Sequence, residues 1–521
     1  MGQSNALHSA CPQAIRRPAA IALFAALAIL SACTVGPDYQ PPKMDMPGRW
    51  TEPLPKAEEH SRETLARWWR GFHDARLNAL VERALRENLD IQAAEARLLA
   101  ARAQRSAAAA QRWPHLNASS SYQRERVSPN ALKGLLGSAQ GGGSGLSTGL
   151  VSTLGPIGQP FDLFQASFDS SWELDLFGGI RRGVEAADAS AEAAQENQRD
   201  IHVSLAAEVA RGYLELIALQ KRLEIARRQL ENQRKLHELV ADLFKEGNAS
   251  GLDLKRADAE QEVAQTAVPA LEAQIANARH SLALLLGQPP GAQVREWANL
   301  AADIPPPPTL PVGMPADLLR RRPDIRQAER GVAAATAAVG VAVAELFPKI
   351  TLTGVAGLQS QALSDFANLS SGFYGFGPRL SLPIFQAGQL LANIDTQQAK
   401  SREALKAYEK TVLVAFREVE DALAAMDGEQ RRQQHLIAAE AASRRSAEAA
   451  LAFYTEGQAE LQTVLDTRRV WYEAQDQLTL SELAWASDHI ALFKALGGGW
   501  NAEDSPPSGE GKAAQPPGEN R

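Results

Sequence analysis

Few residue patterns in this 521-residue chain could support catalysis. Gly145-Leu146-Ser147-Thr148-Gly149 has the letters of a hydrolase nucleophile elbow, but that motif needs a strand before it and a helix after it. Here it lies inside a Gly- and Ser-rich stretch at 131–158, which we expect to be a flexible loop. The nine histidines are scattered without an HExxH pair, and two cysteines are too few for a thiolate metal cluster. The sequence therefore predicts neither an enzyme nor a bound cofactor.

One cysteine has the setting of a covalent modification site. An apolar run at 19–30 follows two arginines, is too short to span a bilayer as a helix, and is typical of a secretory signal. It ends in Leu30-Ser31-Ala32-Cys33, which resembles the lipobox where bacterial lipoproteins are cleaved and acylated. An ordinary signal cleavage site beside a chance cysteine is the alternative. We predict a signal peptide at 1–32, a covalent lipid on Cys33 that inserts into the outer membrane, and a linker at 33–67.

The formal charge of the chain argues against nucleic acid as a partner. The net charge is -7, and it becomes -9 when the two arginines of the signal are removed. No basic stretch with interleaved aromatic residues is present in the sequence.

Strict alternation marks one segment as a strand with two different faces. Phe164, Phe168, Trp172 and Leu174 fall on one face, whereas Asp169 and Glu173 fall on the other. Weaker alternation recurs elsewhere, although Pro378 and Pro383 weaken the last segment. The predicted strands are 116–126, 161–176, 349–358 and 373–384.

The sequence contains an internal repeat. Asn88 to Ile91 resembles Arg322 to Ile325, and Trp113-Pro114 resembles Phe347-Pro348, both at the same separation along the chain. Leu176-Phe177 matches Ile384-Phe385, and Gly247 matches Gly457, at a shorter separation because one loop between strands is longer in the first copy. We therefore predict a first repeat at 68–304, which contains a helical hairpin at 184–287. A Pro-rich linker at 305–316 separates it from a second repeat at 317–500, which contains a hairpin at 388–496. The residues at 501–521 are predicted to form a disordered tail.

Both hairpins show coiled-coil seams, in which apolar or small residues recur at alternating steps of three and four. The predicted seam of the first hairpin runs from Ile201 to Leu230, and that of the second runs from Leu405 to Met426. We expect the seams to pack into a rigid wall and the charged residues between them to face solvent.

Four strands cannot close a membrane barrel by themselves, because every strand edge in lipid must be paired and the smallest barrels have about eight strands. Either several chains share one barrel or the strands form a small soluble sheet. Two chains would give eight strands and three would give twelve. The lipid site and the alternation favour the barrel, with Phe164, Phe168, Trp172 and Leu174 facing lipid and Asp169 and Glu173 facing a water-filled lumen.

Several motifs together resemble the TolC-like outer membrane factors, and in particular the lipoprotein branch that serves RND efflux pumps. They are CTVGPDYQPP at 33–42, WWRGFHDARLNALVERALRENLDIQAAEARLLAARA at 68–103, WELDLFGG, RRPDI, LFPKITL, LPIFQAG and YTEGQAELQTVLDTRR. The resemblance covers residues 33–500. It implies a homotrimer with a twelve-stranded outer membrane barrel and a twelve-helix periplasmic tunnel. It also implies two partners, a periplasmic adaptor protein and an inner-membrane RND-type pump that supplies the energy.

The resemblance also suggests functional residues at the hairpin tips. It implies that Asp466 rings the pore constriction, that Arg469 pairs with it, and that Tyr454 helps to hold the tunnel closed. Asp253 could join this aperture or could be a first-turn charge that favours the helix dipole. Another branch of the family has a lock that needs an arginine at Ala459 and an acid at Thr463, so that lock is missing here. The predicted adaptor-binding residues are Gly247, Ser250, Leu252, Gly457 and Leu461.

Two other functions stay open from the sequence. The same channel could serve type I protein secretion. A protein of another class, a structural coiled-coil lipoprotein of the periplasm, would need the four strands to form a soluble sheet.

Overall fold

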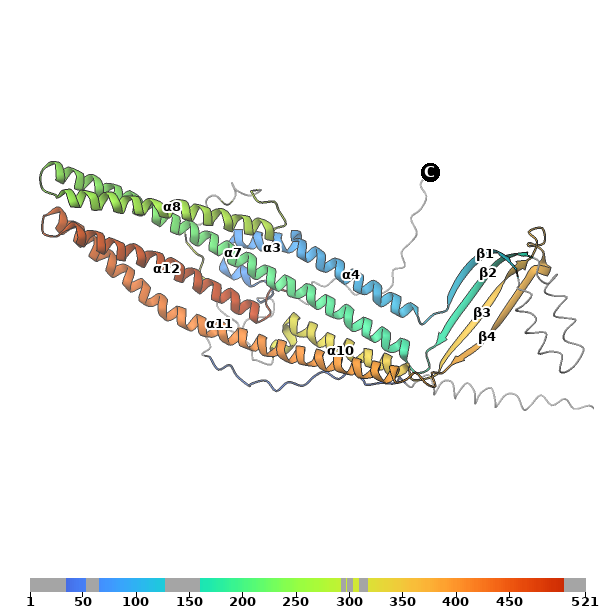
Figure 1. The fold of residues 1–521 in the computed structure, drawn as a ribbon. Coiled ribbons are helices and arrows are strands. Elements are labelled where there is room, and N and C mark those ends of the chain that lie inside the picture. The colour runs from blue at the N-terminus through green and yellow to red at the C-terminus, as the bar shows by residue number, and fades with distance from the viewer. Residues whose placement is uncertain are drawn as a thin grey trace, which may run out of the picture. The chain divides into compact units, whose positions relative to one another are not determined.

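The computed structural model describes residues 34–52, 65–126, 160–291, 297, 303–308 and 317–500 (Figure 1). The predicted signal peptide, Cys33, the loop at 131–158 and the tail at 501–521 lie outside these residues. In chain order the elements are η1 (Trp68–Phe72), α3 (Ala75–Glu87), α4 (Leu89–Ala110), β1 (His115–Glu125), β2 (Phe161–Leu174), α7 (Gly179–Lys245), α8 (Gly251–Leu285), α9 (Leu318–Arg321), α10 (Pro323–Ala344), β3 (Lys349–Ser360), η4 (Leu369–Ser371), β4 (Gly372–Ser381), α11 (Gln389–Thr455) and α12 (Leu461–Ala495).

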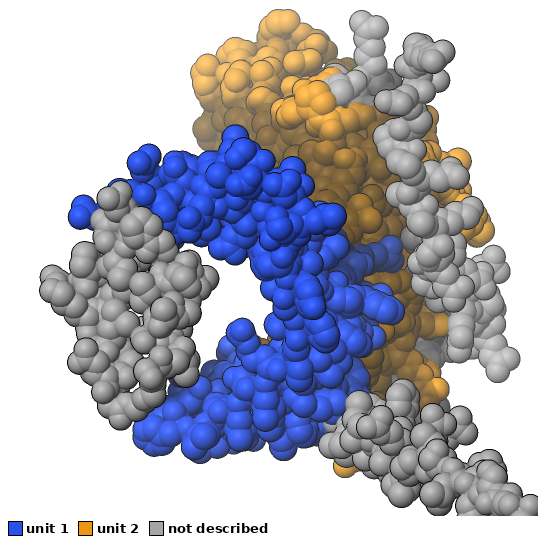
Figure 2. Space-filling view, turned by 90° about the vertical axis from the view of Figure 1, so that its right-hand side faces the viewer, with its two compact units in different colours: residues 1–40, 102–189, 333–402 blue, residues 41–101, 190–332, 403–521 orange. Residues whose placement is uncertain are grey.

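The chain forms two compact units, coloured separately in Figure 2. Unit 1 comprises residues 1–40, 102–189 and 333–402, and unit 2 comprises residues 41–101, 190–332 and 403–521. Each unit takes segments from both sequence repeats, so the compact units differ from the predicted division at 305–316. The space-filling view shows that unit 1 curves around a hollow (Figure 2).

Unit 1 contains a four-stranded antiparallel sheet with the order β1-β2-β3-β4. Each of the four predicted segments forms a strand, but β1, β2 and β4 end earlier than predicted, β1 by one residue at Glu125. β2 ends at Leu174 rather than at residue 176, and β4 ends at Ser381 rather than at residue 384. Pro383 lacks the N–H that a longer β4 would need, whereas Pro378 lies inside β4 on an edge strand, where proline is tolerated.

Unit 2 contains the distal parts of two helical hairpins, α7–α8 and α11–α12. The predicted seams are buried, as shown by Val209 and Leu216 in α7 and by Val412 and Val419 in α11, each with an exposed fraction of 0%. Small side chains such as Ala206, Ala210 and Ala415 fill the spaces between these larger residues and allow the helices to approach closely.

The prediction that the intervening charges face solvent is wrong for several residues. Lys221 Nζ lies 2.7 Å from Glu482 Oε2, and Arg222 Nε lies 2.6 Å from Asp476 Oδ1. Both pairs join α7 to α12, which are so distant in sequence that no local pattern could indicate the contact. The two hairpins are therefore linked to each other by ion pairs as well as by apolar packing.

The sequence repeat is visible in matching contacts. Asn88 Nδ2 donates to the carbonyl of Leu285 at 2.9 Å, and Arg322 Nη1 donates to the carbonyl of Ala495 at 3.0 Å. Asn88 and Arg322 are repeat partners, and Leu285 and Ala495 are repeat partners as well. Equivalent contacts thus tie the last turn of each return helix to the start of α4 or α10.

Among the helices of the described residues, none combines the length and the apolarity that a bilayer crossing would require.

Candidate functional site

The sheet of unit 1 has one apolar face that continues across all four strands. Residues paired directly across an antiparallel ladder share a face, so the strand registers decide which side chains lie together. Phe168, for example, pairs with Ala118 of β1 and with Ala356 of β3, which in turn pairs with Tyr374 of β4. The large side chains of this face are Leu116, Tyr122, Phe164, Phe168, Trp172, Leu174, Ile350, Leu352, Leu358, Tyr374, Phe376 and Leu380.

This apolar face is exposed in the single chain. The exposed fraction is 60% for Phe168, 80% for Tyr374 and 86% for Phe376. An apolar patch of this size on a free surface marks contact with a membrane or a protein. The predicted lipid-facing residues Phe164, Phe168, Trp172 and Leu174 all fall on this face.

The opposite face of the sheet is polar. Asn117 Nδ2 donates to Asp169 Oδ2 at 3.0 Å, and the hydroxyls of Ser119 and Ser167 are 3.1 Å apart. Glu173 lies opposite Thr351 on the same face. The alternation that the sequence showed for β2 therefore extends over the whole sheet, as a membrane strand with a watery lumen on one side requires.

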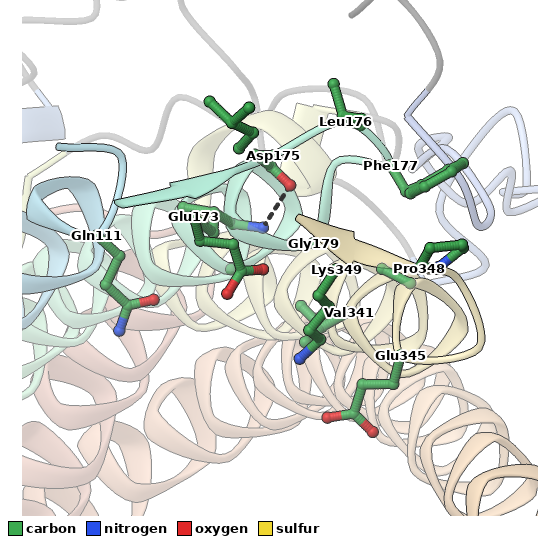
Figure 3. A pocket seen from close by; sticks show the side chains of 14 residues that line it. Gln111, Glu173, Asp175, Leu176, Phe177, Gly179, Val341, Glu345, Pro348 and Lys349 are labelled. Carbon is green, nitrogen blue, oxygen red and sulfur yellow. Dashed lines mark hydrogen bonds between the residues drawn. The ribbon is translucent and has the colours of Figure 1, made fainter. Parts of the chain in front are cut away.

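The end of β2 and the start of β3 meet α7 and α10 around a cavity of about 210 Å³, which polar and apolar side chains line together (Figure 3). Asp175 accepts hydrogen bonds from the backbone N–H groups of Ile180 at 3.1 Å and Arg181 at 2.8 Å, so it caps the first turn of α7. Glu173, Glu345 and Lys349 also line the cavity. Asp175 thus fixes the backbone at the turn where the chain passes from β2 into α7.

The residues just after Cys33 are fixed to this same junction within unit 1. The N–H of Val35 donates to the carbonyl of Phe177 at 3.1 Å, and Arg182 Nε donates to the carbonyl of Val35 at 3.2 Å. The side chain of Arg182 is only 5% exposed and pairs with Asp38 at 2.5 Å and with Glu185 at 2.7 Å. Residues 35–38 are therefore held close to the end of β2.

The tips of the two hairpins have nearly the same backbone. Gly247 and Gly457 adopt positive φ angles of 80° and 73°, which a residue with a Cβ rarely adopts. Asn248 N donates to the carbonyl of Leu243, and Gln458 N donates to the carbonyl of Phe453, each at 2.8 Å. Both predicted glycines thus end their helices by the same left-handed turn.

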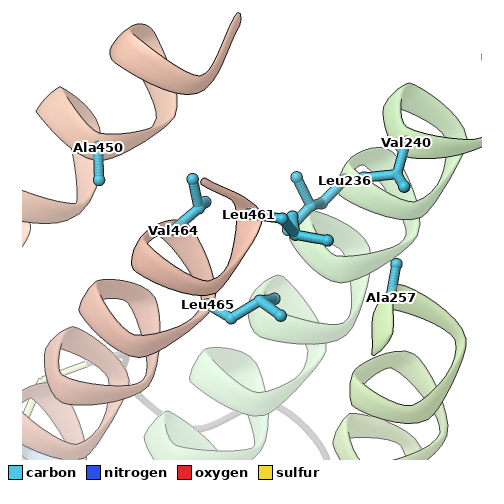
Figure 4. Close-up of a cluster of buried hydrophobic side chains, with 7 residues drawn as sticks. All are labelled: Leu236, Val240, Ala257, Ala450, Leu461, Val464 and Leu465. Carbon is cyan, nitrogen blue, oxygen red and sulfur yellow. The ribbon is translucent and has the colours of Figure 1, made fainter. Parts of the chain in front are cut away.

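The helices below the tips share an apolar cluster, which we call the tip cluster (Figure 4). All four long helices contribute to it, and Tyr454 packs against its edge. Burial, reinforced by the charge of Asp253, raises the pKa of Tyr454 above its ordinary value. The cluster consists of Leu236, Val240, Ala257, Ala450, Leu461, Val464 and Leu465.

The structure separates the predicted tip residues into different environments. Leu252 is 59% exposed at the first tip, as a docking residue should be, whereas Leu461 is only 2% exposed inside the tip cluster. Leu461 therefore does not offer the exposed side chain that the predicted adaptor-binding surface requires, because it packs against the other hairpin rather than facing solvent.

The predicted pair of Asp466 and Arg469 forms. Arg469 Nη2 lies 3.4 Å from Asp466 Oδ1, and Gln462 Nε2 donates to Asp466 Oδ2 at 3.1 Å. Both charged side chains are about half exposed or more, so the charge of Asp466 remains accessible to solvent. Asp253 has a second role, since its carboxylate accepts from the N–H of Ser250 while Ser250 Oγ accepts from the N–H of Asp253. This capping box supports the first-turn interpretation of Asp253.

Comparison with known proteins agrees with this geometry. The family model described as "Outer membrane efflux protein" matches residues 80–288 and 314–498, which is well over half of the chain. The chain belongs to this family. It is 32% identical over 483 residues to Nodulation protein T of Rhizobium leguminosarum bv. trifolii, covering 91% of this chain and 96% of that protein.

Two further relatives of the outer membrane efflux family match along nearly their whole length. The pyoverdine export outer membrane protein OpmQ of Pseudomonas aeruginosa is 32% identical over 487 residues, covering 93% of this chain and 97% of that protein. The solved structure of the outer-membrane channel OprN matches with a TM-score of 0.78 and 34% identity, covering 90% of this chain and 100% of that one. The chain is thus an outer membrane efflux channel, in a family of transport proteins rather than enzymes.

Two features of the site were missed from the sequence. The tip cluster includes Leu236 and Val240 of α7, and alternating steps of three and four from Leu230 pass through the polar Gln233 and His237 before they reach Val240, so the period alone did not indicate the cluster. The burial of Arg182 against residues 35–38 had no signal in the sequence, because its partner Asp38 lies 144 residues away.

Proposed function

We propose that this chain is one third of the exit duct of a tripartite efflux pump. Three copies join their four-stranded sheets into a twelve-stranded outer membrane barrel, and their long helices form a twelve-helix tunnel in the periplasm. A periplasmic adaptor and an inner-membrane RND-type pump deliver the cargo, which crosses the duct passively. The cargo is a set of small molecules, and relatives named for pyoverdine export and for toluene efflux indicate how varied such cargo is in this family.

The observation that carries this proposal is the two-faced sheet with open edges. Its apolar face spans four strands and is highly exposed, its other face is polar, and β1 and β4 each have a neighbour on one side only within the described chain. Strand edges in lipid must be paired. Further copies of the same sheet satisfy both requirements, because they cover the edges while leaving the apolar face to lipid.

A covalent lipid on Cys33 completes the proposed attachment to the membrane. The contacts of Val35 and Asp38 with the strand–helix junction would place the acyl chains next to the apolar face, where lipid would already be present. Several acyl chains make a lasting anchor at about 0.8 kcal/mol for each buried methylene. Mass spectrometry of the mature N-terminal peptide tests this directly, and an unmodified Cys33 would disprove the anchor without affecting the barrel.

The orientation of the sheet can be tested with two neighbouring substitutions in β2. Phe168→Lys places a charge on the apolar face, at a cost of about 2–4 kcal/mol near the middle of a bilayer. Asp169→Lys places the same charge on the polar face. We expect Phe168→Lys to lower the amount of trimer assembled in the outer membrane, and Asp169→Lys to assemble normally. Equal loss for both variants, or loss for Asp169→Lys alone, would contradict the proposal.

At the hairpin tips, we propose that Asp466, Arg469, Tyr454 and Asp253 hold the resting aperture closed. Three copies of Asp466 around a threefold axis would attract cations and repel anions. The double variant Asp466→Ala with Tyr454→Phe should raise the single-channel conductance in planar bilayers and reduce the preference for cations. Unchanged conductance and selectivity would assign these residues to packing alone.

The proposed adaptor surface now comprises Gly247, Ser250, Leu252 and Gly457, without Leu461. Leu252→Lys should abolish crosslinking to the adaptor and cause drug sensitivity in cells, while the purified channel keeps its conductance. Normal crosslinking and normal efflux would show that the adaptor docks elsewhere.

A further inference from the structure

The internal repeat of the sequence specifies how one copy of this chain meets the next. Within unit 1, β2 of the first repeat pairs with β3 of the second repeat. The two outer strands are their repeat partners, because β4 corresponds to β2 and β1 corresponds to β3. The β2–β3 junction is therefore an internal template for a junction between β4 of one copy and β1 of a neighbouring copy.

We infer that β4 of one copy pairs with β1 of the neighbouring copy in the register of the β2–β3 template, and that Phe385 of the first copy stacks on Trp113 of the second. This inference rests on the proposed function, since it presumes a ring of chains, and it adds the residue-by-residue contacts of that ring.

The aromatic pair comes from a contact that is already present in the chain. Phe177 and Phe347 stack with their ring centroids 4.7 Å apart and an angle of 22° between their planes. Phe385 is the repeat partner of Phe177, and Trp113 is the repeat partner of Phe347. Phe385 and Trp113 therefore occupy the positions of the two stacked rings.

The exposure of the four rings agrees with this assignment. Phe177 and Phe347, which have each other as partners, are half-buried. Phe385 is 87% exposed and Trp113 is 71% exposed in the single chain. Exposed aromatic side chains of this size are costly in water, and stacking them against each other removes that cost.

The template also fixes the strand register. In the β2–β3 ladder Glu173 pairs with Thr351 and Leu174 pairs with Ile350. Replacing each residue of the ladder by its repeat partner pairs Ser381 with Asn117 of the neighbouring copy and Phe376 with its Tyr122. The paired segments become 373–381 and 117–125, which cover nearly all of β4 and β1.

The faces of the two sheets provide an independent check on this register. In β4 the apolar face carries even-numbered residues such as Phe376 and Leu380, and in β1 it carries Ala118 and Tyr122. The derived register joins even residues to even residues, so the apolar face continues without a break into the next copy. A shift by one residue would place the apolar side chains of one copy beside the polar side chains of the other.

This contact is heterologous, since β4 of each copy meets β1 of the next, and heterologous contacts close into rings when the rotation between copies allows it. The alternating directions of β1 to β4 make β4 antiparallel to the neighbouring β1, as in every other pair of the sheet. Each added copy therefore repeats the same junction without any new type of strand pair.

Disulfide crosslinking tests the register directly. Ser381→Cys with Asn117→Cys in one chain should give disulfides between copies, seen as covalent dimers and trimers on non-reducing gels. Ser381→Cys with Ser121→Cys is the matched out-of-register control, because four residues of strand displace the thiols by about 13 Å, too far for a disulfide. Glu173→Cys with Thr351→Cys should form a disulfide within one chain, so the protein should still run as a monomer on the non-reducing gel. This variant controls for the oxidation conditions.

The outcomes separate this inference from the proposed function. A crosslink between copies at 381–117 supports the inference. The inference is overturned if an intact trimer crosslinks at 381–121, or if it fails to crosslink at 381–117 while the 173–351 control succeeds. Neither result would contradict the trimeric channel. Absence of any trimer of the unmodified chain in mild detergent would instead overturn the proposed function, and the inference with it.

The stacked pair is tested by a double-mutant cycle that needs no cysteine. Phe385→Leu and Trp113→Leu should each lower the temperature at which the detergent-solubilised trimer dissociates, and the double variant should lower it by less than the sum of the two shifts. Additive shifts would show that the two rings do not touch. Phe177→Leu is the comparison variant, because it removes the equivalent stacked ring inside one chain, where the partner Phe347 belongs to the same copy.

Discussion

The two hairpin tips have the same turn but are held in different ways. At the first tip Ser250 and Asp253 form a capping box at the start of α8. At the second tip Glu460 occupies the position equivalent to Ser250, and its side chain makes no capping hydrogen bond to α12. Leu461, which follows it, is buried in the tip cluster, whereas its equivalent Gly251 has no side chain to bury. The first tip thus has a local cap in addition to its contacts with the tip cluster, whereas the second lacks that cap and depends more on packing against the other hairpin.

Polar contacts below the tips show the same division. His237 Nε2 of α7 lies 2.7 Å from Asp258 Oδ1 of α8, so this hydrogen bond stays inside the first hairpin. Arg468, at the position equivalent to Asp258, instead donates to the carbonyl of Asn232 on α7 at 3.2 Å. Asn232 Nδ2 also donates to the hydroxyl of Tyr472 at 3.1 Å. The start of α12 should therefore loosen whenever the hairpins separate, while the start of α8 should keep its own structure.

Truncating Leu461 should have the largest effect on this comparison. Leu461→Ala removes a fully buried leucine side chain, at a cost of about 2–5 kcal/mol for such a site. We expect faster amide hydrogen exchange at the first two turns of α12 and little change at the start of α8. Leu252→Ala is the control, because Leu252 is 59% exposed and loses little packing. Equal effects of Leu461→Ala on both tips would show that the second tip has no special dependence on the cluster.

Much of this architecture follows from the sequence, for physical reasons that differ between regions. Strand β2 could be predicted because its alternation is strict, and a period of two residues has one structural meaning. The end of β4 was overestimated because Leu382 and Ile384 continue the alternation past Pro383, where the ladder stops. Gly247 and Gly457 were found because only glycine readily adopts the positive φ angle that ends each helix.

The contacts between hairpins could not be predicted in this way. Leu461 follows a turn and looks like a surface residue from its local sequence, yet its surroundings include Leu236 and Val240 from the other sequence repeat. The ion pair of Lys221 with Glu482 likewise depends on which helices become neighbours. Periodicity states that a helix has an apolar face, whereas the identity of the helix that covers it is a property of the whole fold.

Removing the capping serine should have a smaller effect, confined to the first tip. Ser250→Ala removes the side-chain acceptor of the Asp253 N–H and should destabilise the start of α8 by about 1 kcal/mol. Glu460→Ala is the matched variant at the second tip and should change little, since Glu460 makes no capping bond to lose. Amide exchange of the first turns of α8 and α12 measures both effects. A larger effect from Glu460→Ala would reverse the proposed difference between local and cluster-dependent tips.

The smallest effect concerns the acid dependence of the first hairpin. Hydrogen bonds from Lys255 and then from His237 lower the pKa of Asp258 below its ordinary value. A carboxyl group with a lowered pKa in the folded state contributes stability above its unfolded pKa of about 3.9, and this contribution is lost as the pH falls through the folded value.

Amide exchange near His237 and Asp258 should therefore accelerate below about pH 4 in the parent chain, and much less in Asp258→Asn, whose side chain does not titrate. Because Asp258 is exposed, about 1 M salt should reduce the difference between the two proteins, since it shortens the screening length to about 3 Å. The second hairpin has Arg468 at the equivalent position and should show no matching acid step there. If amide exchange accelerated equally in Asp258→Asn below about pH 4, a group other than Asp258 would be responsible for the acid dependence of the first hairpin. The difference between the two hairpins would then be supported only by the capping box and the tip cluster.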